Sequence, residues 1–205
     1  MRPYQKEKSR MSDVICRRAD KHLTEGQLKD IAALIYDTDL YIYPAMFADR
    51  QEAETVLPKM IRAGDPMFRR ENLFLAMQGT KVVGILLWFR GPLEWDKTVY
   101  RKCGGKAEHI DRVVMEYFNL FTEAPENMAS LVRISVSEGM RGKQIGSLLT
   151  DTFMQEEKGP YQLYVLADNM KAIPFFEGKG FAIRETRPGF SLDYRPLPCY
   201  WMVRK

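Results

Sequence analysis

Apolar residues recur at helical spacing in two segments near the start of the chain. The first segment follows Thr24-Glu25-Gly26-Gln27, where the threonine and the glutamine predict a capping box. Its apolar members are Leu28, Ile31, Ala32 and Ile35. The second segment follows Asp49 and Glu52, which repeat the capping signature, and ends at Gly64-Asp65-Pro66. Its apolar members are Ala53, Val56, Leu57, Met60 and Ile61. Two amphipathic helices are therefore predicted.

Three β-prone segments flank these helices. Asp13–Arg18 alternates polar and apolar residues, which is typical of a strand. Asn72–Gln78 and Lys81–Arg90 are apolar runs joined only by Gly79-Thr80. Because glycine readily supplies the positive φ of a two-residue turn, this connection predicts an antiparallel hairpin.

The pattern is less regular from Gly91 to Asn127. Gly91-Pro92 and Gly104-Gly105 indicate loops. One amphipathic helix is predicted from Ala107, Ile110, Val113, Val114, Tyr117 and Phe118. We interpret 91–127 as a variable insertion.

The second half of the chain predicts a βαβ unit. A strand at 131–136 leads through a Gly-rich turn into a helix that ends at Lys158-Gly159-Pro160, and the next strand is Tyr161–Leu166. The two strands of such a unit are parallel. The remaining predicted elements are a short helix from Asn169 to Phe176, ended by Gly180, and strands at Phe181–Arg187 and Cys199–Val203.

Composition limits the class of protein. A chain of 205 residues, 45% hydrophobic and 28% charged, fits one folded domain at 13–205 after a polar tail at 1–12. The longest apolar run, Val82–Phe89, is shorter than the roughly 20 residues of a bilayer span. The tail also lacks the apolar region of a secretion signal. We therefore expect a cytoplasmic protein that does not contact membranes.

Charge and cysteine spacing exclude two further classes. The net charge of +4 is spread along the chain, so no nucleic-acid partner is expected. Cys16, Cys103 and Cys199 stand far apart, and His22 and His109 are isolated. No metal site is therefore expected.

The turn after strand 131–136 carries the candidate chemistry. Unpaired N–H groups at a helix start bind phosphate oxygens, and Arg141 and Lys143 add positive charge. An ordinary turn with solvated basic residues is the alternative. A Walker A loop is disfavoured because Ser137 stands where its first glycine belongs and Gln144 follows the lysine. GxGxxG is absent as well, which argues against ATP and dinucleotides.

Two motifs carry a resemblance to a known family. Arg141-Gly142-Lys143-Gln144-Ile145-Gly146 resembles the R/Q-x-x-G-x-G/A pyrophosphate loop of the GNAT superfamily of acyl-CoA N-acyltransferases. The segment 169–181 is similar to its second motif, Asn-x-x-Ala-x-x-x-Tyr-x-x-x-Gly-Phe, at the family's spacing. Over 13–205 the resemblance implies a mixed α/β fold, with a mostly antiparallel sheet, a central parallel βαβ pair and helices on both faces. It also implies acetyl-CoA as cosubstrate, no metal, and a small-molecule or peptide amine as acceptor.

The resemblance also implies site residues. The cofactor-binding set is Ile134, Ser135, Val136, Arg141, Gly142, Lys143, Gln144, Ile145, Gly146, Ser147, Asn169 and Phe176. A bulge in 134–136 would splay this strand from its parallel neighbour, and the backbone N–H of Val136 would polarise the thioester carbonyl.

Two positions depart from the family pattern. Gln144 replaces the first motif glycine, which is tolerable with a negative φ. Phe176 replaces a tyrosine that protonates the CoA thiolate in many members, and phenylalanine has no proton to donate. Two alternatives remain. The thiolate leaves without a proton donor, or it receives a proton from Tyr164, Tyr194 or Tyr200.

The general base and the acceptor site are less defined. Strand 131–136 contains no carboxylate, so Glu138 is the nearest candidate base, and water-mediated removal is equally plausible. Further candidates are Glu94, Asp96, Glu108, His109, Asp111 and Glu116. Two roles are open for Tyr41, Tyr43, Met46 and Phe47: they form the wall of the acceptor site, or they pack in the core. Trp95 is a candidate for contact with the substrate.

The function predicted is N-acetyl transfer from acetyl-CoA to a primary amine within a ternary complex, without a covalent enzyme intermediate. A catalytically inactive CoA-binding sensor or interaction domain is the alternative that Phe176 keeps open. A nucleotide-binding protein that uses the same loop is a third. The apolar strand Cys199–Val203, taken as an unprotected sheet edge, predicts a homodimer.

Overall fold

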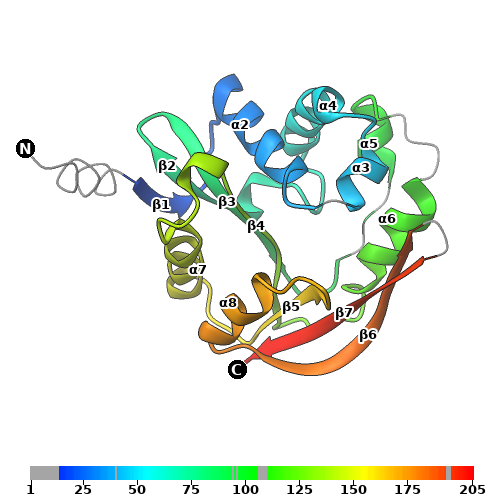
Figure 1. Cartoon of the computed structure of the whole chain (residues 1–205). Coiled ribbons are helices and arrows are strands. Elements are labelled where there is room, and N and C mark those ends of the chain that lie inside the picture. The colour runs from blue at the N-terminus through cyan, green and yellow to red at the C-terminus, as the bar shows by residue number, and fades with distance from the viewer. Residues whose placement is uncertain (1–13, 40, 94, 96, 106–109, 193–194) are drawn as a thin grey trace, which may run out of the picture.

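The computed structural model describes residues 14–205 except 40, 94, 96, 106–109 and 193–194. Within these residues seven strands form one sheet in the order β1-β2-β3-β4-β5-β7-β6 (Figure 1). The strands are β1 (Val14–Arg18), β2 (Leu73–Gln78), β3 (Lys81–Arg90), β4 (Ala129–Val136), β5 (Tyr161–Leu166), β6 (Ala182–Leu192) and β7 (Arg195–Arg204). Only the β4–β5 pair is parallel among the described strands. The predicted mixed fold with one central parallel pair is confirmed.

Helices cover both faces of the sheet. The helices are α2 (Glu25–Tyr36), α3 (Ile42–Met46), α4 (Arg50–Ala63), α5 (Lys97–Lys102), α6 (Ile110–Asn119), α7 (Ile145–Glu156) and α8 (Ala172–Gly178), with 3-10 turns η1 (Arg70–Asn72) and η2 (Glu138–Met140). Figure 1 shows α7 and α8 on one side of the sheet and α2, α3 and α4 on the other. Each side has its own apolar core. The short helices α3 and α5 were not predicted from the sequence.

The two predicted N-terminal helices form for the reasons that their sequences indicate. The Thr24 hydroxyl accepts the N–H of Gln27 at 3.2 Å, and the Gln27 side chain accepts the N–H of Thr24 at 3.0 Å. This reciprocal pair is the predicted capping box of α2. The Asp49 carboxylate caps α4 by accepting the N–H of Glu52 at 2.8 Å. Gly64, at φ 71°, ends that helix in the left-handed conformation.

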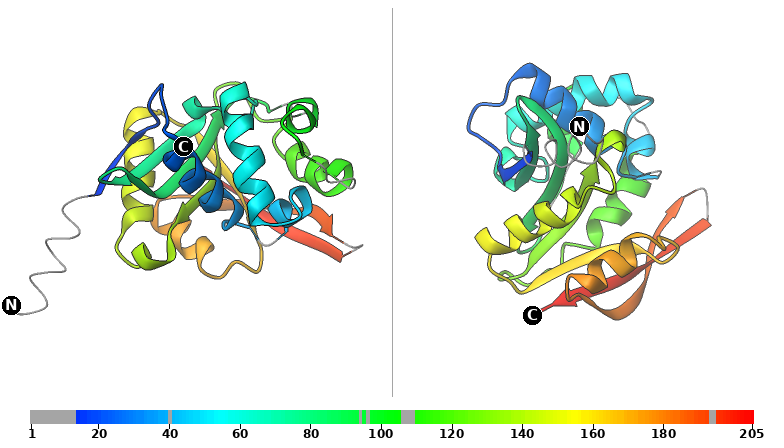
Figure 2. Two further views of the ribbon diagram at one scale, coloured as in Figure 1. Left: turned by 90° about the horizontal axis from the view of Figure 1, so that it is seen from above. Right: turned by 60° about the vertical axis from the view of Figure 1, so that its left-hand side comes forward.

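The hairpin prediction is confirmed, whereas the edge-strand prediction is wrong. Gly79 has φ 61° in the turn between the antiparallel strands β2 and β3. At the other end of the chain, β7 pairs with both β5 and β6, so it is an interior strand. β6 and β7 form a long ribbon that extends past the rest of the sheet (Figure 2). The homodimer stays a prediction, but β7 offers no free edge to support it.

The segment 91–127 packs into the core through its described residues. Tyr100 is buried and its hydroxyl donates to the carbonyl of Met46. Trp95, expected to contact substrate, is instead buried: its indole N–H donates to Asp65 at 3.2 Å and its ring packs on Phe118. The predicted helix is α6, although Ala107 lies outside the described residues. The described part of 91–127 is therefore well packed, and its interpretation as a segment of variable sequence stays a prediction.

Candidate functional site

The parallel strands β4 and β5 separate along their length. They are paired only at Ala129–Tyr161, Ser130–Gln162 and Leu131–Leu163. Beyond that point β4 stays paired with β3 only, and β5 stays paired with β7 only. The register between β3 and β4 shifts so that Val132 is the extra residue of a bulge. The predicted splay is present, and its bulge lies two residues before the predicted segment 134–136.

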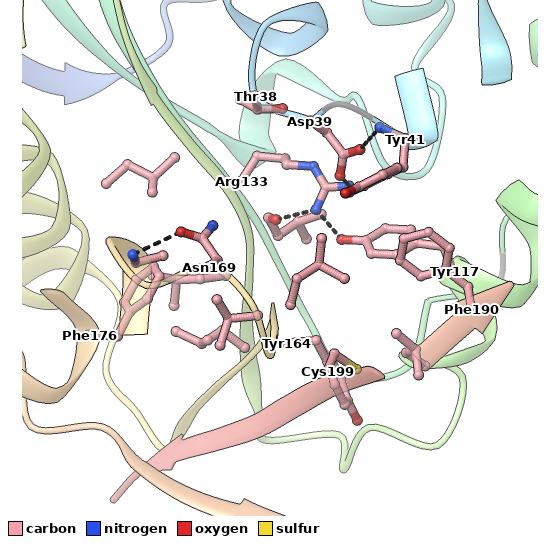
Figure 3. A pocket seen from close by; sticks show the side chains of 18 of the residues that line it. Thr38, Asp39, Tyr41, Tyr117, Arg133, Tyr164, Asn169, Phe176, Phe190 and Cys199 are labelled. Atoms are coloured by element: carbon pink, nitrogen blue, oxygen red, sulfur yellow. Dashed lines mark hydrogen bonds and ion pairs between the residues drawn. The ribbon is translucent and has the colours of Figure 1, made fainter. Parts of the chain in front are cut away.

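A cavity of about 450 Å³ occupies the gap between the separated strands (Figure 3). Its walls come from β4, β5, the connection before α3, the helices α6 and α8, and the ribbon of β6 and β7. The lining includes Asp39, Tyr41, Tyr117, Arg133, Ile134, Tyr164, Asp168, Asn169, Phe176, Phe190 and Cys199. Segments far apart in the sequence therefore build one site at the centre of the sheet.

The backbone of Val136 faces this gap. Ser137 donates its N–H to the carbonyl of Val83 at 2.9 Å, which identifies these two as a hydrogen-bonded pair. Because such pairs alternate with non-hydrogen-bonded ones, the preceding pair, Gly84–Val136, directs the N–H and C=O of Val136 away from β3. The N–H expected to polarise the thioester carbonyl thus points toward the side from which β5 has diverged.

The turn from β4 into α7 is built on two left-handed residues. Gly142 has φ 76°, and Gln144, directly before α7, has φ 59° and ψ 12°. The condition under which glutamine would be easily tolerated, a negative φ, is not met: the residue keeps the conformation that suits the family's glycine, at the steric cost of a side chain. Gln144 is the only non-glycine residue with positive φ in the described part of the chain.

The first turn of α7 presents backbone N–H groups and positive charge. The N–H groups of Ile145, Gly146 and Ser147 have no intrahelical acceptor because they lie in the first turn, and the side chain of the N-cap residue Gln144 does not cap them. Arg141 donates through Nε to the carbonyl of Val136 at 3.1 Å, and Lys143 lies 3.6 Å from the sulfur of Met140. Neither cation forms an ion pair with a residue that the structure describes. This is the arrangement that binds phosphate oxygens.

The second motif positions α8 at the cavity. The Asn169 side chain accepts the N–H of Ala172 at 3.0 Å and so stabilises the first turn of that helix. Phe176 is buried, lines the cavity and packs edge-on against Phe175 and Phe181. Asn169 and Ile134 are the other predicted cofactor residues that line this cavity. Four more of the predicted residues line a separate hollow beside α7, namely Lys143, Gln144, Ile145 and Ser147.

Of the three tyrosines considered as proton donors, Tyr164 lines the cavity. Burial raises its pKa above the ordinary value, so the phenol is protonated at neutral pH. Tyr200 is on β7 among the residues packed against the core under α7, and Tyr194 lies outside the described residues.

The two predicted carboxylates whose side chains the structure describes, Glu116 and Glu138, do not line the cavity. Glu138 is exposed on η2 and does not line the cavity, and Glu116 accepts the N–H of Ser191 at 2.7 Å. Glu94, Asp96, Glu108 and His109 lie outside the described residues, as does the side chain of Asp111. The described carboxylates that line the cavity are Asp39 and Asp168, neither of which carries a sequence signal. No group of three or more metal-ligating side chains occurs among the described residues.

A buried charged cluster, which the sequence reasoning missed, forms one wall. Arg133 donates to Asp39 at 3.1 Å and to the hydroxyl of Tyr117 (Figure 3). Burial opposes the charge of the guanidinium, but Tyr117, Tyr43 and Asp39 outweigh it and raise the pKa of Arg133. Burial raises the pKa of Tyr117, so this phenol stays protonated. The available signal was a lone arginine within the otherwise uncharged strand 131–136.

The expected acceptor wall is divided between core and cavity. Tyr43, Met46 and Phe47 are buried in the core beneath α2 and α4. Tyr41 lines the cavity beside Asp39, which accepts its N–H at 2.6 Å. Core packing is thus the outcome for three of these four residues.

Solved structures with a similar fold include acetyltransferases. An N-acetyltransferase from Staphylococcus aureus Mu50 superposes with a TM-score of 0.67 and 15% identity over 93% of this chain and 100% of the other. A ribosomal-protein-alanine N-acetyltransferase from Brucella melitensis gives 0.57 and 20% over 93% and 98%. Arabidopsis thaliana Naa50, in complex with a bisubstrate analogue of CoA and a peptide, gives 0.51 and 17% over 94% and 99%. These likenesses show the fold.

Sequence comparison identifies the family. No curated protein matches the chain significantly. A model of the Acetyltransferase (GNAT) family matches residues 43–181, which is more than half of the chain and includes the separated strands, the turn before α7 and the second motif. The chain therefore belongs to the GNAT acetyltransferase family.

Proposed function

We propose that the protein transfers an acetyl group from acetyl-CoA to a primary amine by direct attack within a ternary complex. The observation that carries this proposal is the opening between β4 and β5, lined at one side by the free backbone edge of β4 and next to the uncapped start of α7. The first feature suits a thioester and its pantetheine arm, and the second suits a pyrophosphate. Solved relatives in complex with CoA or a CoA analogue support the same cosubstrate.

The residues proposed to hold acetyl-CoA fall into two groups. The pyrophosphate would lie on the N–H groups of 145–147, with Arg141 and Lys143 neutralising its charge and Gly142 leaving the approach open. A Cβ atom built on Gly142 meets no atom within 4 Å, so the space beside this backbone is clear. The pantetheine arm would run between Ile134 to Val136 on β4 and the ring of Phe176 on α8.

The chemistry proposed is a nucleophilic acyl substitution. The amine nitrogen bonds to the thioester carbon, the C–S bond breaks, and the nitrogen loses a proton while the CoA thiolate gains one. The N–H of Val136 would stabilise negative charge on the carbonyl oxygen. Holding both reactants in one cavity makes the step effectively intramolecular.

We assign the two proton transfers to cavity residues. Tyr164 would protonate the thiolate, since Phe176 carries no hydroxyl. Asp168, which is exposed at the cavity, would accept the amine proton directly or through water. Asp39 is unsuited to this role because its two oxygens already accept hydrogen bonds from two backbone N–H groups and from Arg133. Glu138 lies outside the cavity lining, so no proton transfer is assigned to it.

The second candidate is a CoA-binding domain without turnover, which Phe176 favours because the usual acid is missing. Thiol release from acetyl-CoA separates the two functions. The wild-type protein is incubated with acetyl-CoA and a panel of primary amines, and free CoA is measured against controls without amine and without protein. Amine-dependent release supports the transferase. Saturable acetyl-CoA binding without release by any amine would support the sensor and contradict the transferase.

A further inference from the structure

The buried arginine of β4 has hydrogen-bonding capacity that the protein does not use. The Arg133 side chain is 9% exposed and lies between Asp39 and Tyr117 in the cavity wall (Figure 3). Its Nη1 donates to Tyr117 and to the carbonyl of Val132, and its Nη2 donates to Asp39. Its Nε is buried without an acceptor.

Two tyrosine side chains lie beside this guanidinium. The Tyr43 hydroxyl is buried without a partner, and its ring lies 5.3 Å from the guanidinium carbon of Arg133. The Tyr117 oxygen accepts from Arg133, so its own proton is available for donation. Burial keeps both phenols protonated by raising their pKa.

The carboxylate of the cluster already accepts hydrogen bonds through both of its oxygens. Asp39 is the carboxylate within it, and its Oδ1 accepts the N–H groups of Tyr41 and Ile42 at 2.6 and 2.7 Å. Its Oδ2 accepts from Arg133. The wall of the cavity therefore presents a positively charged donor and a phenol donor to whatever binds there, and both complement a group that only accepts hydrogen bonds.

We infer that the acceptor amine also carries a carboxylate, which Arg133 and Tyr117 bind. An ionised carboxylate is an acceptor-only group with two oxygens and matches the planar guanidinium. Because the cavity of about 450 Å³ also has to hold the acetyl end of the cosubstrate, we expect a small acceptor of the amino-acid kind. This inference rests on the proposed acetyltransferase function and names its substrate class.

Matched pairs of acceptors test the inference. Free amino acids are compared with the corresponding amino-acid amides and with dipeptides, and kcat/KM is measured from thiol release. We expect the acids to be preferred by about tenfold or more, which corresponds to about one charge-assisted interaction. The amine of an amide is less basic, so a larger share of it is neutral and reactive. A preference for the acid would therefore run against intrinsic reactivity.

Two variants connect the preference to this wall. Tyr117→Phe removes one donor without a change of charge and is expected to reduce the preference for the acids several-fold. Arg133→Met combined with Asp39→Asn removes the ion pair as a unit, so that no unpaired carboxylate is left buried, and is expected to abolish the preference. Circular dichroism and urea unfolding check that both variants are folded.

The failure of this inference is distinguishable from the failure of the proposed function. Equal kcat/KM for acids and amides, or equal loss for both in the variants, would overturn the carboxylate site while the transferase stands. If no amine releases thiol, the transferase fails, and binding is then read by thermal shift in the presence of CoA. Stabilisation by amino acids but not by their amides would support the site. Stabilisation by both or by neither would overturn it.

Discussion

Replacing Gln144 by glycine is expected to stabilise the protein. Gln144 has φ 59° and ψ 12°, the left-handed conformation in which a Cβ atom costs about 1–2 kcal/mol. Glycine removes this cost but loses about 0.5–1 kcal/mol more chain entropy on folding. The net expectation for Gln144→Gly is a gain of about 0.5–1 kcal/mol in the free energy of unfolding.

Two neighbouring glycines provide matched controls. Gly142 has φ 76°, so Gly142→Ala imposes the same kind of strain and is expected to destabilise by about 1 kcal/mol. Gly146 lies in the first turn of α7 without a positive φ, and a Cβ there meets Ile134 and Phe175 at ordinary contact distances of 3.8 and 3.9 Å. Gly146→Ala is therefore expected to be neutral or stabilising by up to about 1 kcal/mol.

The assay is equilibrium unfolding in urea, with the slope m compared among the variants so that a change in midpoint reports stability. The changes in the free energy of unfolding should have opposite signs for Gln144→Gly and Gly142→Ala. A loss of stability greater than about 0.5 kcal/mol in Gln144→Gly would refute it, because the glutamine side chain would then contribute more than its backbone conformation costs.

Three further predictions concern catalysis and pH. Tyr164→Phe is expected to lower kcat with no change in acetyl-CoA affinity by calorimetry; unchanged kcat would remove Tyr164 as the acid. Asp168→Asn should lower kcat/KM by roughly tenfold or more, and an unchanged kcat/KM would show that another group or water takes the proton. Burial raises the pKa of Cys199 from 9.0 to about 11, so the thiol ionises in the unfolded chain before it does in the folded one. This contribution to stability is complete below pH 9 and is lost as pH rises from 9 to 11. Cys199→Ala should therefore flatten the decline of stability over this range, and an unchanged slope would show that the buried thiol does not cause it.

Local signals predicted a large part of the fold. The capping residues of α2 and α4, and the glycine turn between β2 and β3, act over a few residues, so their patterns carry the information. The parallel arrangement of β4 and β5 followed from the general behaviour of βαβ units. The turn before α7 and the helix α8 were expected from motifs of fixed spacing.

Features that depend on distant parts of the chain were not predictable in this way. The insertion of β7 between β5 and β6 is a matter of strand pairing, and an apolar strand suits an edge or an interior position equally. Arg133 meets Asp39 across 94 positions of sequence, and neither residue belongs to a motif. The left-handed φ of Gln144 opposes the preference of its own side chain, so only the surrounding turn could impose it.

The most direct test of the central claim is calorimetric titration of acetyl-CoA into the wild-type protein and into Gly142→Glu, with Gly142→Ala as the control for backbone strain. We expect saturable binding to the wild type and to Gly142→Ala, and none to a folded Gly142→Glu, because the new carboxylate would add bulk and negative charge beside the proposed pyrophosphate position. For the wild type, acetyl-CoA at about 100 times its Kd should also stabilise the fold by about 2.7 kcal/mol, whereas ATP and NAD should not. Equal affinity of all three proteins for acetyl-CoA would contradict the account, since the turn before α7 would then not be the phosphate site.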